Sequence, residues 1–213
     1  MQYMKRFLMT MAAVLLSAVA ALAQTPEEIF DKVDEVMDRA KENGMSMTMT
    51  MKIPIVGSFS TKMYILGEKT RAEMKAMGRE LIIWTDGRCS WSYDAKENTI
   101  VIEDELGGTN DDNGLNMMDG LTDGYDVKLD EESEKAWFFI CKKRKDNPDK
   151  DSPKKMEITI RKRDYSLGQL KTSMKGVTLI LSNISIGGIS EASVTFDASK
   201  YPDATIEDKR GKK

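Results

Sequence analysis

The chain has 213 residues, two cysteines, no histidine and a net charge of −3. This length suits one domain with a substantial core, and the mildly acidic balance argues against nucleic acid as a partner. The lack of histidine removes the usual general base and the commonest metal ligand, which disfavours acid–base enzymes and zinc proteins.

Residues 1–23 have the layout of a secretory signal peptide. Lys5 and Arg6 precede an apolar run over 7–20, and the Ala-Leu-Ala sequence ending at Ala23 fits the small-x-small cleavage rule. The apolar run of about 14 residues is too short for a membrane anchor, which needs roughly 20. We therefore expect cleavage after Ala23, export to the periplasm and a single mature domain over 24–213.

A helix is predicted directly after the cleavage site. Thr25 can cap it, Pro26 suits its first turn, and Gly44 ends it. Its apolar residues recur at helical spacing on one face. They are Ile29, Phe30, Val33, Val36, Met37 and Ala40. This pattern predicts one amphipathic helix that packs on a sheet.

The hydrophobic period changes to two after the helix, which is typical of strands. Methionines alternate with hydroxyl residues over 45–51, and the alternation continues through a meander of about six strands that ends near residue 103. Asp86-Gly87 lies between two apolar runs and predicts a hairpin turn.

More strands are predicted in the second half of the chain. They lie between 125 and 186, at 191–196 and, as a last short strand, at 204–207. The total of about eleven strands in hairpin order indicates a mainly β protein with an antiparallel sheet or barrel.

Residues 104–124 interrupt the strands with an acidic, glycine-rich stretch. Such a length inside a domain usually means a functional loop or a lid. Its aspartates suggest calcium, but their spacing does not match the EF-hand loop, so a solvated loop is favoured and no metal site is expected. The stretch contains a short apolar island, which is Leu115, Met117, Met118 and Leu121.

No catalytic motif is present. The clustered carboxylates lie in polar turns, whereas a hydrolase pair needs one carboxylate in an apolar pocket. The chain has no nucleophile elbow, no phosphate-binding loop and no dinucleotide fingerprint. The sequence therefore indicates a protein that is not an enzyme and that needs no cofactor.

Cys89 and Cys141 leave two interpretations open. An oxidising compartment permits a disulfide between them, and two free buried thiols are the alternative, since unpaired cysteine packs as a small hydrophobe. Both cysteines lie in apolar strands, so we expect them to be dispensable for binding.

Methionine is concentrated on the apolar faces of the predicted strands. It is unbranched and lines surfaces that accept varied apolar shapes, but it also fills ordinary cores. A packed core and a ligand cavity are therefore both open interpretations. The residues assigned to the interior, and so to the lining of a cavity, are Met47, Met49, Phe59, Met63, Met74, Ile83, Trp91 and Leu179.

Two stretches resemble the outer-membrane lipoprotein carrier (LolA-type) family. Residues 85–94, TDGRCSWSYD, are similar to the hairpin of that family, and 193–210 are similar to its closing segment. The signal, the single helix and the early meander come in the family's order. The resemblance spans most of 25–210.

The resemblance implies an unclosed half-barrel of about eleven strands, with the helix and a lid segment over an apolar cavity. It implies a periplasmic carrier, a monomer, that shuttles acylated lipoproteins or other lipids from an inner-membrane releasing complex to an outer-membrane acceptor. The lid would be the apolar island of 104–124, and Arg71 would stand at the cavity mouth, although the family's Arg-Pro is missing there. The alternative is a lipid-responsive sensor or accessory lipid-binding protein of the same fold.

Overall fold

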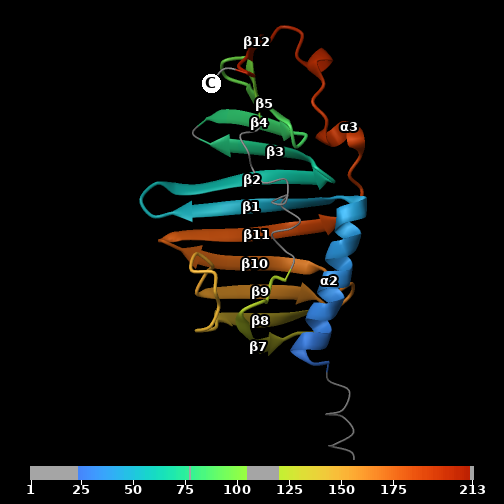
Figure 1. Ribbon diagram of the computed structural model, residues 1–213, viewed down its shortest axis with the longest axis vertical. Coiled ribbons are helices and arrows are strands. Elements are labelled where there is room, and N and C mark those ends of the chain that lie inside the picture. The colour runs from blue at the N-terminus through green and yellow to red at the C-terminus, as the bar shows by residue number, and fades with distance from the viewer. Residues whose placement is uncertain (1–23, 77, 105–119, 212–213) are drawn as a thin grey trace, which may run out of the picture.

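Twelve strands form one sheet in the part of the chain that the computed structural model describes, which is residues 24–76, 78–104 and 120–211. The strand order is β12-β6-β5-β4-β3-β2-β1-β11-β10-β9-β8-β7. Figure 1 shows the strands stacked in this order, with one long helix running across them.

The elements have the following bounds. The helices are α2 (Pro26–Asn43), the short α3 (Glu191–Val194) and the single-turn η2 (Ala198–Lys200). The strands of the first half are β1 (Met45–Ile53), β2 (Gly57–Leu66), β3 (Lys69–Ala76), β4 (Arg79–Thr85), β5 (Cys89–Asp94) and β6 (Thr99–Asp104). Those of the second half are β7 (Tyr125–Glu132), β8 (Ala136–Lys143), β9 (Lys155–Arg161), β10 (Leu167–Met174), β11 (Val177–Ile186) and β12 (Thr205–Asp208).

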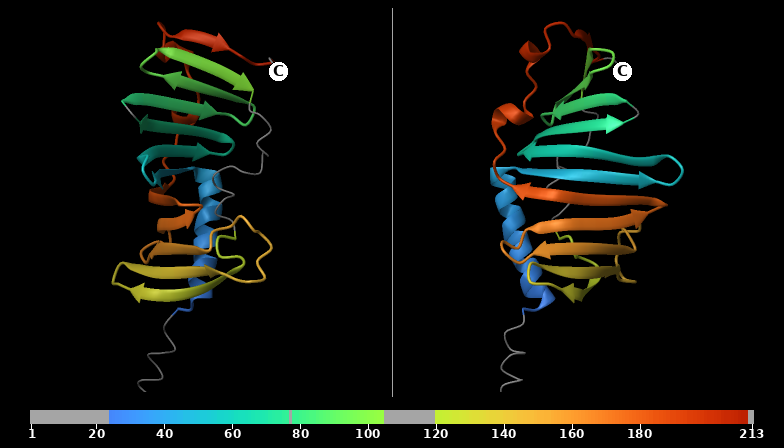
Figure 2. Two further views of the ribbon diagram at one scale, coloured as in Figure 1. Left: turned by 90° about the vertical axis from the view of Figure 1, so that its left-hand side faces the viewer. Right: turned by 180° about the vertical axis from the view of Figure 1, so that it is seen from behind.

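The sheet is not closed into a barrel. β7 and β12 stand at its two edges, and neighbouring strands are antiparallel except for β12, which runs parallel to β6. Figure 2 shows the resulting twisted, open sheet from two further sides. The predicted class, a mainly β unclosed half-barrel with an N-terminal helix, is confirmed.

One predicted strand is wrong. Residues 191–196 hold the four-residue helix α3 and an extended link after it. Only the short strand predicted at 204–207 follows, as β12. The alternation over 191–196 is explained instead by Val194 and Phe196, which turn toward the sheet from a segment that lies on it.

The predicted helix is confirmed at both ends. Thr25 accepts a hydrogen bond from the Glu28 backbone, and the Glu28 side chain accepts one from the Thr25 backbone, which is a capping box. Gly44, with a φ of 76°, ends the helix. The six apolar residues expected on one face are all buried against the sheet.

Strand register defines two faces of the sheet, because residues paired across neighbouring strands point to the same side. The inner face carries the row Phe139, Ile158, Leu170, Leu181 and Met49. The α2 helix lies on this face, and its Phe30 ring is 5.0 Å from that of Phe139. The main core lies here.

The outer face is covered differently. It carries the row Trp91, Trp84, Arg71 and Tyr64 on β5, β4, β3 and β2. The C-terminal segment 190–204 crosses it, and its Phe196 ring lies 5.5 Å from Trp84 and 5.7 Å from Trp91. The two ends of the chain thus cover opposite faces of the sheet.

Both cysteines are free thiols. Cys89 lies on the outer face of β5, and Cys141 lies on the inner face of β8, in the row of Met156 and Leu179. Burial raises the pKa of Cys141 to about 11. The two cysteines are therefore unpaired, as in the second interpretation, with Cys141 buried and Cys89 half-buried.

Among the described residues, no helix is long and apolar enough to cross a bilayer.

Candidate functional site

The methionine stripe of β1 is partly core and partly cavity. Met45 and Met47, at the start of the strand, are buried under the end of α2. Met49 and Met51, further along, are only half-buried, because the helix does not reach them. Along β1, the alternating methionines therefore change from packing in the core to lining a cavity.

An apolar cavity of about 550 Å³ lies where the helix cover ends. This volume falls in the usual range for small-molecule pockets, about 300–1,000 Å³. Its lining comes from β1, β2, β9, β10 and β11 and from two loops. The lining residues are Met47, Met49, Met51, Met63, Leu121, Pro153, Met156, Leu170, Thr172, Met174, Val177, Leu179 and Leu181.

The chemistry of this lining is uniform. Among the described lining residues, Thr172 carries the only polar side chain, and its hydroxyl already donates to the Lys155 carbonyl at 2.9 Å. None of these residues is charged. The methionines of this lining can adapt to an apolar guest of variable shape. The arrangement is suited to binding an apolar group.

The cavity opens beside two hairpin turns. Met51 lies near the end of β1, and Met174 and Val177 flank the turn between β10 and β11. Met174 is 45% exposed although it lines the cavity. The lining therefore continues to the protein surface at this end of the sheet.

The structure gathers some of the predicted interior residues at this cavity. Met47, Met49, Met63 and Leu179 line it, and so does Leu121 from the predicted lid. Phe59, Met74 and Ile83 lie on the inner face as well, since they pair with Met51, Thr61 and Ala72. They stand outside the cavity, with Met74 and Ile83 further toward β4. Leu115, Met117 and Met118 lie outside the described residues.

Trp91 corrects the prediction. It pairs with Trp84 and points to the outer face, so it does not line the cavity. The inner face of β5 carries Ser90, Ser92 and Asp94 instead. The alternation of β5 is as predicted, but its aromatic side lies under the C-terminal segment and not toward the interior of the sheet.

The position of Arg71 also differs from the prediction. It was expected at the cavity mouth, and it lies on the outer face, with its guanidinium 5.7 Å from the Tyr64 ring and 5.8 Å from the Trp84 ring. It forms an ion pair with Glu73. These contacts make Arg71 part of the aromatic cluster under the C-terminal segment.

Apart from Leu179, sequence reasoning missed the part of the cavity that the second hairpin supplies. Leu170, Met174, Val177 and Leu181 come from β10 and β11, whose apolar alternation was recognised. Their place beside the methionines depends on the pairing of β1 with β11, far apart in the chain. No local signal reveals that pairing.

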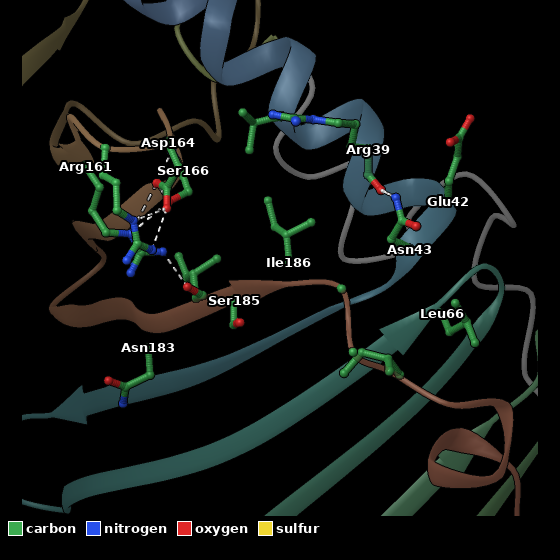
Figure 3. A pocket seen from close by; sticks show the side chains of 16 residues that line it. Arg39, Glu42, Asn43, Leu66, Arg161, Asp164, Ser166, Asn183, Ser185 and Ile186 are labelled. Carbon is green, nitrogen blue, oxygen red and sulfur yellow. Dashed lines mark hydrogen bonds and ion pairs between the residues drawn. The ribbon is translucent and has the colours of Figure 1, made fainter.

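A second hollow, of about 920 Å³, lies at the other end of the strands (Figure 3). It is bordered by the end of α2, the β9–β10 turn and the end of β11. Many of its lining side chains are polar, among them Arg161, Asp164 and Ser166, which bind one another.

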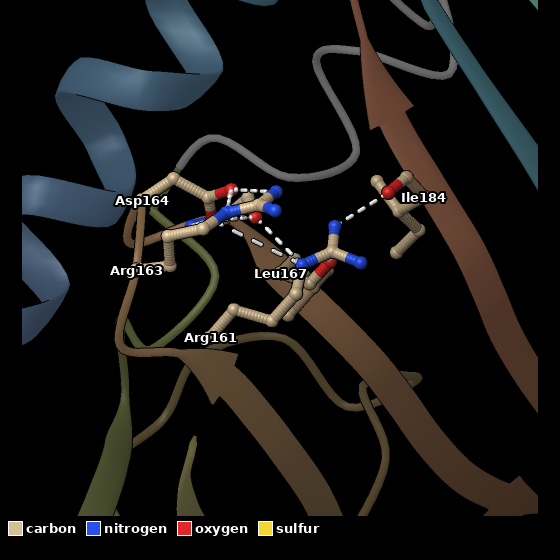
Figure 4. Close-up of polar contacts among 6 residues, drawn as sticks. Arg161, Arg163, Asp164, Leu167 and Ile184 are labelled. Carbon is tan, nitrogen blue, oxygen red and sulfur yellow. Dashed lines mark hydrogen bonds and ion pairs between the residues drawn. The ribbon is translucent and has the colours of Figure 1, made fainter. Parts of the chain in front are cut away.

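Arg161 ties three segments together beside this hollow. Its Nε donates to Ser166 Oγ at 2.8 Å, and an Nη donates to the carbonyls of Leu167 at 3.1 Å and of Ile184 (Figure 4). Burial alone would raise the pKa of Asp164, but hydrogen bonds from Ser166 and Arg163 outweigh it and lower the pKa to about 2. These groups satisfy one another, so we assign them to the structure and not to a ligand.

No protein-family model matches the sequence, and no curated protein matches it. An uncharacterized conserved protein from Thermus thermophilus is similar in structure, with 17% identity, a TM-score of 0.48 and coverage of 87% of this chain and 99% of that one. MucB in the MucA/MucB complex of Pseudomonas aeruginosa has 13% identity, a TM-score of 0.47 and coverage of 80% and 62%. A LolA superfamily protein from Nitrosomonas europaea has 12% identity, a TM-score of 0.35 and coverage of 82% and 99%.

These likenesses extend to no residue or guest of this chain.

Proposed function

We propose that this protein binds the acyl chains of lipids or lipoproteins in the cavity between β2 and β9 and carries them without chemical change. The observation that supports this is the lining, which is apolar at every residue but Thr172. Apolar surface of this kind is stabilised by an apolar guest, because the guest removes it from water.

The remaining parts of the proposal follow from the signal sequence and the family resemblance. The signal peptide ends at Ala23, and the mature monomer works in the periplasm. There it receives its guest from an inner-membrane releasing complex and passes it to an outer-membrane acceptor.

The test places the same charge on the two faces of one strand. Met49 lines the cavity, and Thr50, the next residue, points to the outer face and pairs with Ser60. Wild type, Met49→Lys and Thr50→Lys are titrated with a fluorescent fatty-acid analogue, and their unfolding is followed in denaturant. We expect Met49→Lys to abolish binding, because a lone charge in an apolar cavity costs several kcal/mol. Thr50→Lys should bind like wild type.

Two results would end the proposal. Wild type that does not bind the analogue would mean that the cavity holds no acyl chain. Equal loss in both variants would mean that damage to the sheet, and not the charge in the cavity, removes binding. Mass spectrometry of lipids that co-purify with wild type would then identify the natural guest.

A further inference from the structure

Two hairpin turns lie side by side at the end of the sheet where the cavity opens. The β1–β2 turn covers 54–56, and the β10–β11 turn is Lys175-Gly176. They are neighbours because β1 pairs with β11, with Lys52 opposite Thr178. Figure 1 shows both turns projecting from the same side of the sheet, and the right-hand view of Figure 2 shows them from behind. We call these two turns the paired tips.

The paired tips, and Met174 at the end of β10 directly before the second tip, expose apolar side chains to solvent. Ile55 is fully exposed, Val56 is 55% exposed and Met174 is 45% exposed. Among the described residues, Ile206 on β12 is the only other large hydrophobic residue exposed to this degree. Gathered apolar exposure of this kind marks an interaction site more often than a single exposed leucine does.

Ile55 also has an unfavourable backbone. Its φ is 71°, and Val56 N donates across it to the Pro54 carbonyl at 2.8 Å. This is the rare, strained form of the three-residue turn, and a β-branched residue is among the worst suited to positive φ. The fold gains nothing from an isoleucine here, since the side chain touches little of the protein. Strain and exposure together point to a role outside the fold.

The strands and turns that form the paired tips carry only positive charge, although the chain is acidic. The four central strands and their two turns, over 45–66 and 167–186, contain four lysines and no aspartate or glutamate. Lys52 and Lys62 form no ion pair with another described residue; Lys52 is next to the β1–β2 turn, and Lys62 lies further along β2, opposite Glu73 of β3. Lys171 binds Glu157 at 2.9 Å, and Lys175 lies 3.7 Å from Asp151. Apolar tips with flanking lysines complement a surface of anionic lipid headgroups.

The paired tips are continuous with the cavity. Met174 is exposed at the tip and also lines the cavity, and Met51 and Val177 stand next to it. We propose that the paired tips dock this protein on an anionic lipid bilayer, with Ile55 and Val56 inserted between the headgroups, so that an acyl chain passes along Met174 into the cavity. The passage rests on the proposed function, but the docking does not.

The docking is tested by sedimentation with vesicles of phosphatidylcholine alone and of equal parts phosphatidylcholine and phosphatidylglycerol. Wild type should bind the mixed vesicles. The affinity of the double variant Ile55→Asn, Val56→Asn for these vesicles should be lower by at least about tenfold, because the variant loses the inserted aliphatic groups. Ile206→Asn is the matched control, since its side chain is 52% exposed and lies at the far edge of the sheet; it should bind like wild type. Lys52→Gln with Lys62→Gln should weaken binding to the mixed vesicles and reduce its sensitivity to salt.

The same variants are titrated with the fluorescent fatty-acid analogue in the absence of vesicles. The double tip variant should bind the analogue like wild type, because neither changed residue lines the cavity. Wild type that binds the analogue but no vesicles would overturn the docking and leave the proposed function standing. Tip-dependent vesicle binding without uptake of the analogue would do the reverse. Equal vesicle binding by wild type and the double tip variant would also overturn the docking.

Discussion

Met51 and Leu179 face each other across the junction of β1 and β11, and both side chains line the cavity. The next pair along, Lys52 and Thr178, points to the outer face. On each strand, consecutive residues therefore point to the cavity and to solvent. The cavity can therefore be tested by placing the same substitution at two adjacent positions of one strand, one facing the cavity and one facing solvent.

Leu179→Trp should fill part of the cavity and lower the affinity for a fluorescent fatty-acid analogue by about tenfold or more. The larger ring enters space that is otherwise open, so the free energy of unfolding should change by less than about 1.5 kcal/mol, well below the usual cost of overpacking. Thr178→Trp places the same ring on the outer face and should leave the affinity unchanged. Titration and denaturant unfolding of both variants check this. A fall in affinity with Thr178→Trp alone would mean that the two faces have been exchanged.

Phe196→Ala should destabilise the protein without affecting its cavity. The Phe196 ring lies against Trp84 and Trp91 on the outer face, and Trp84 is buried there. Removing a half-buried aromatic ring should lower the free energy of unfolding by about 2–3 kcal/mol. Affinity for the fatty-acid analogue should remain within about twofold, because the cavity lies on the inner face. Phe196→Leu should cost less. Loss of affinity at full stability would show that the C-terminal segment takes part in binding.

The sequence predicts the helix, all twelve strands and their alternation, together with one false strand over 191–196, because these follow from local periodicity. It could not predict which side of β5 faces inward. The aromatic side chains of Trp91 and Tyr93 favour the interior for that side of β5, whereas the C-terminal segment covers them on the outer face. The cavity was half predicted for a similar reason: the methionines of β1 are local, whereas their pairing with Leu179 and Leu181 joins residues far apart in the chain.

Asp164 should make stability depend on pH in the acid range. Its pKa is lowered to about 2 in the folded protein by hydrogen bonds from Ser166 and Arg163, in spite of burial, and lies near 3.9 when unfolded. A lowered pKa contributes stability above about pH 4 that is lost as the pH falls toward about 2. Since the side chain is 37% exposed, solvent screening limits this contribution to about 1 kcal/mol.

Denaturant unfolding of wild type and Asp164→Asn near pH 5 and near pH 2 checks this. The wild type should be the more stable of the two near pH 5, and the difference should shrink near pH 2. A constant difference at both values would show that the hydrogen-bond geometry, and not the charge, is what the substitution removes.

Ile55→Gly should stabilise the protein, although it removes a large apolar side chain. Ile55 has a φ of 71° and a fully exposed side chain, so the substitution loses no packing. Glycine adopts positive φ without the clash of a Cβ atom, and the relief of about 1–3 kcal/mol of strain exceeds the entropy that glycine adds to the unfolded chain, about 0.5–1 kcal/mol. We expect a net gain of about 1 kcal/mol in denaturant unfolding. Val56→Gly is the matched control: Val56 has no positive φ, so only the entropy cost applies and stability should fall. A loss of stability with Ile55→Gly would mean that the turn is not strained, and the backbone argument for a role of Ile55 outside the fold would fail with it.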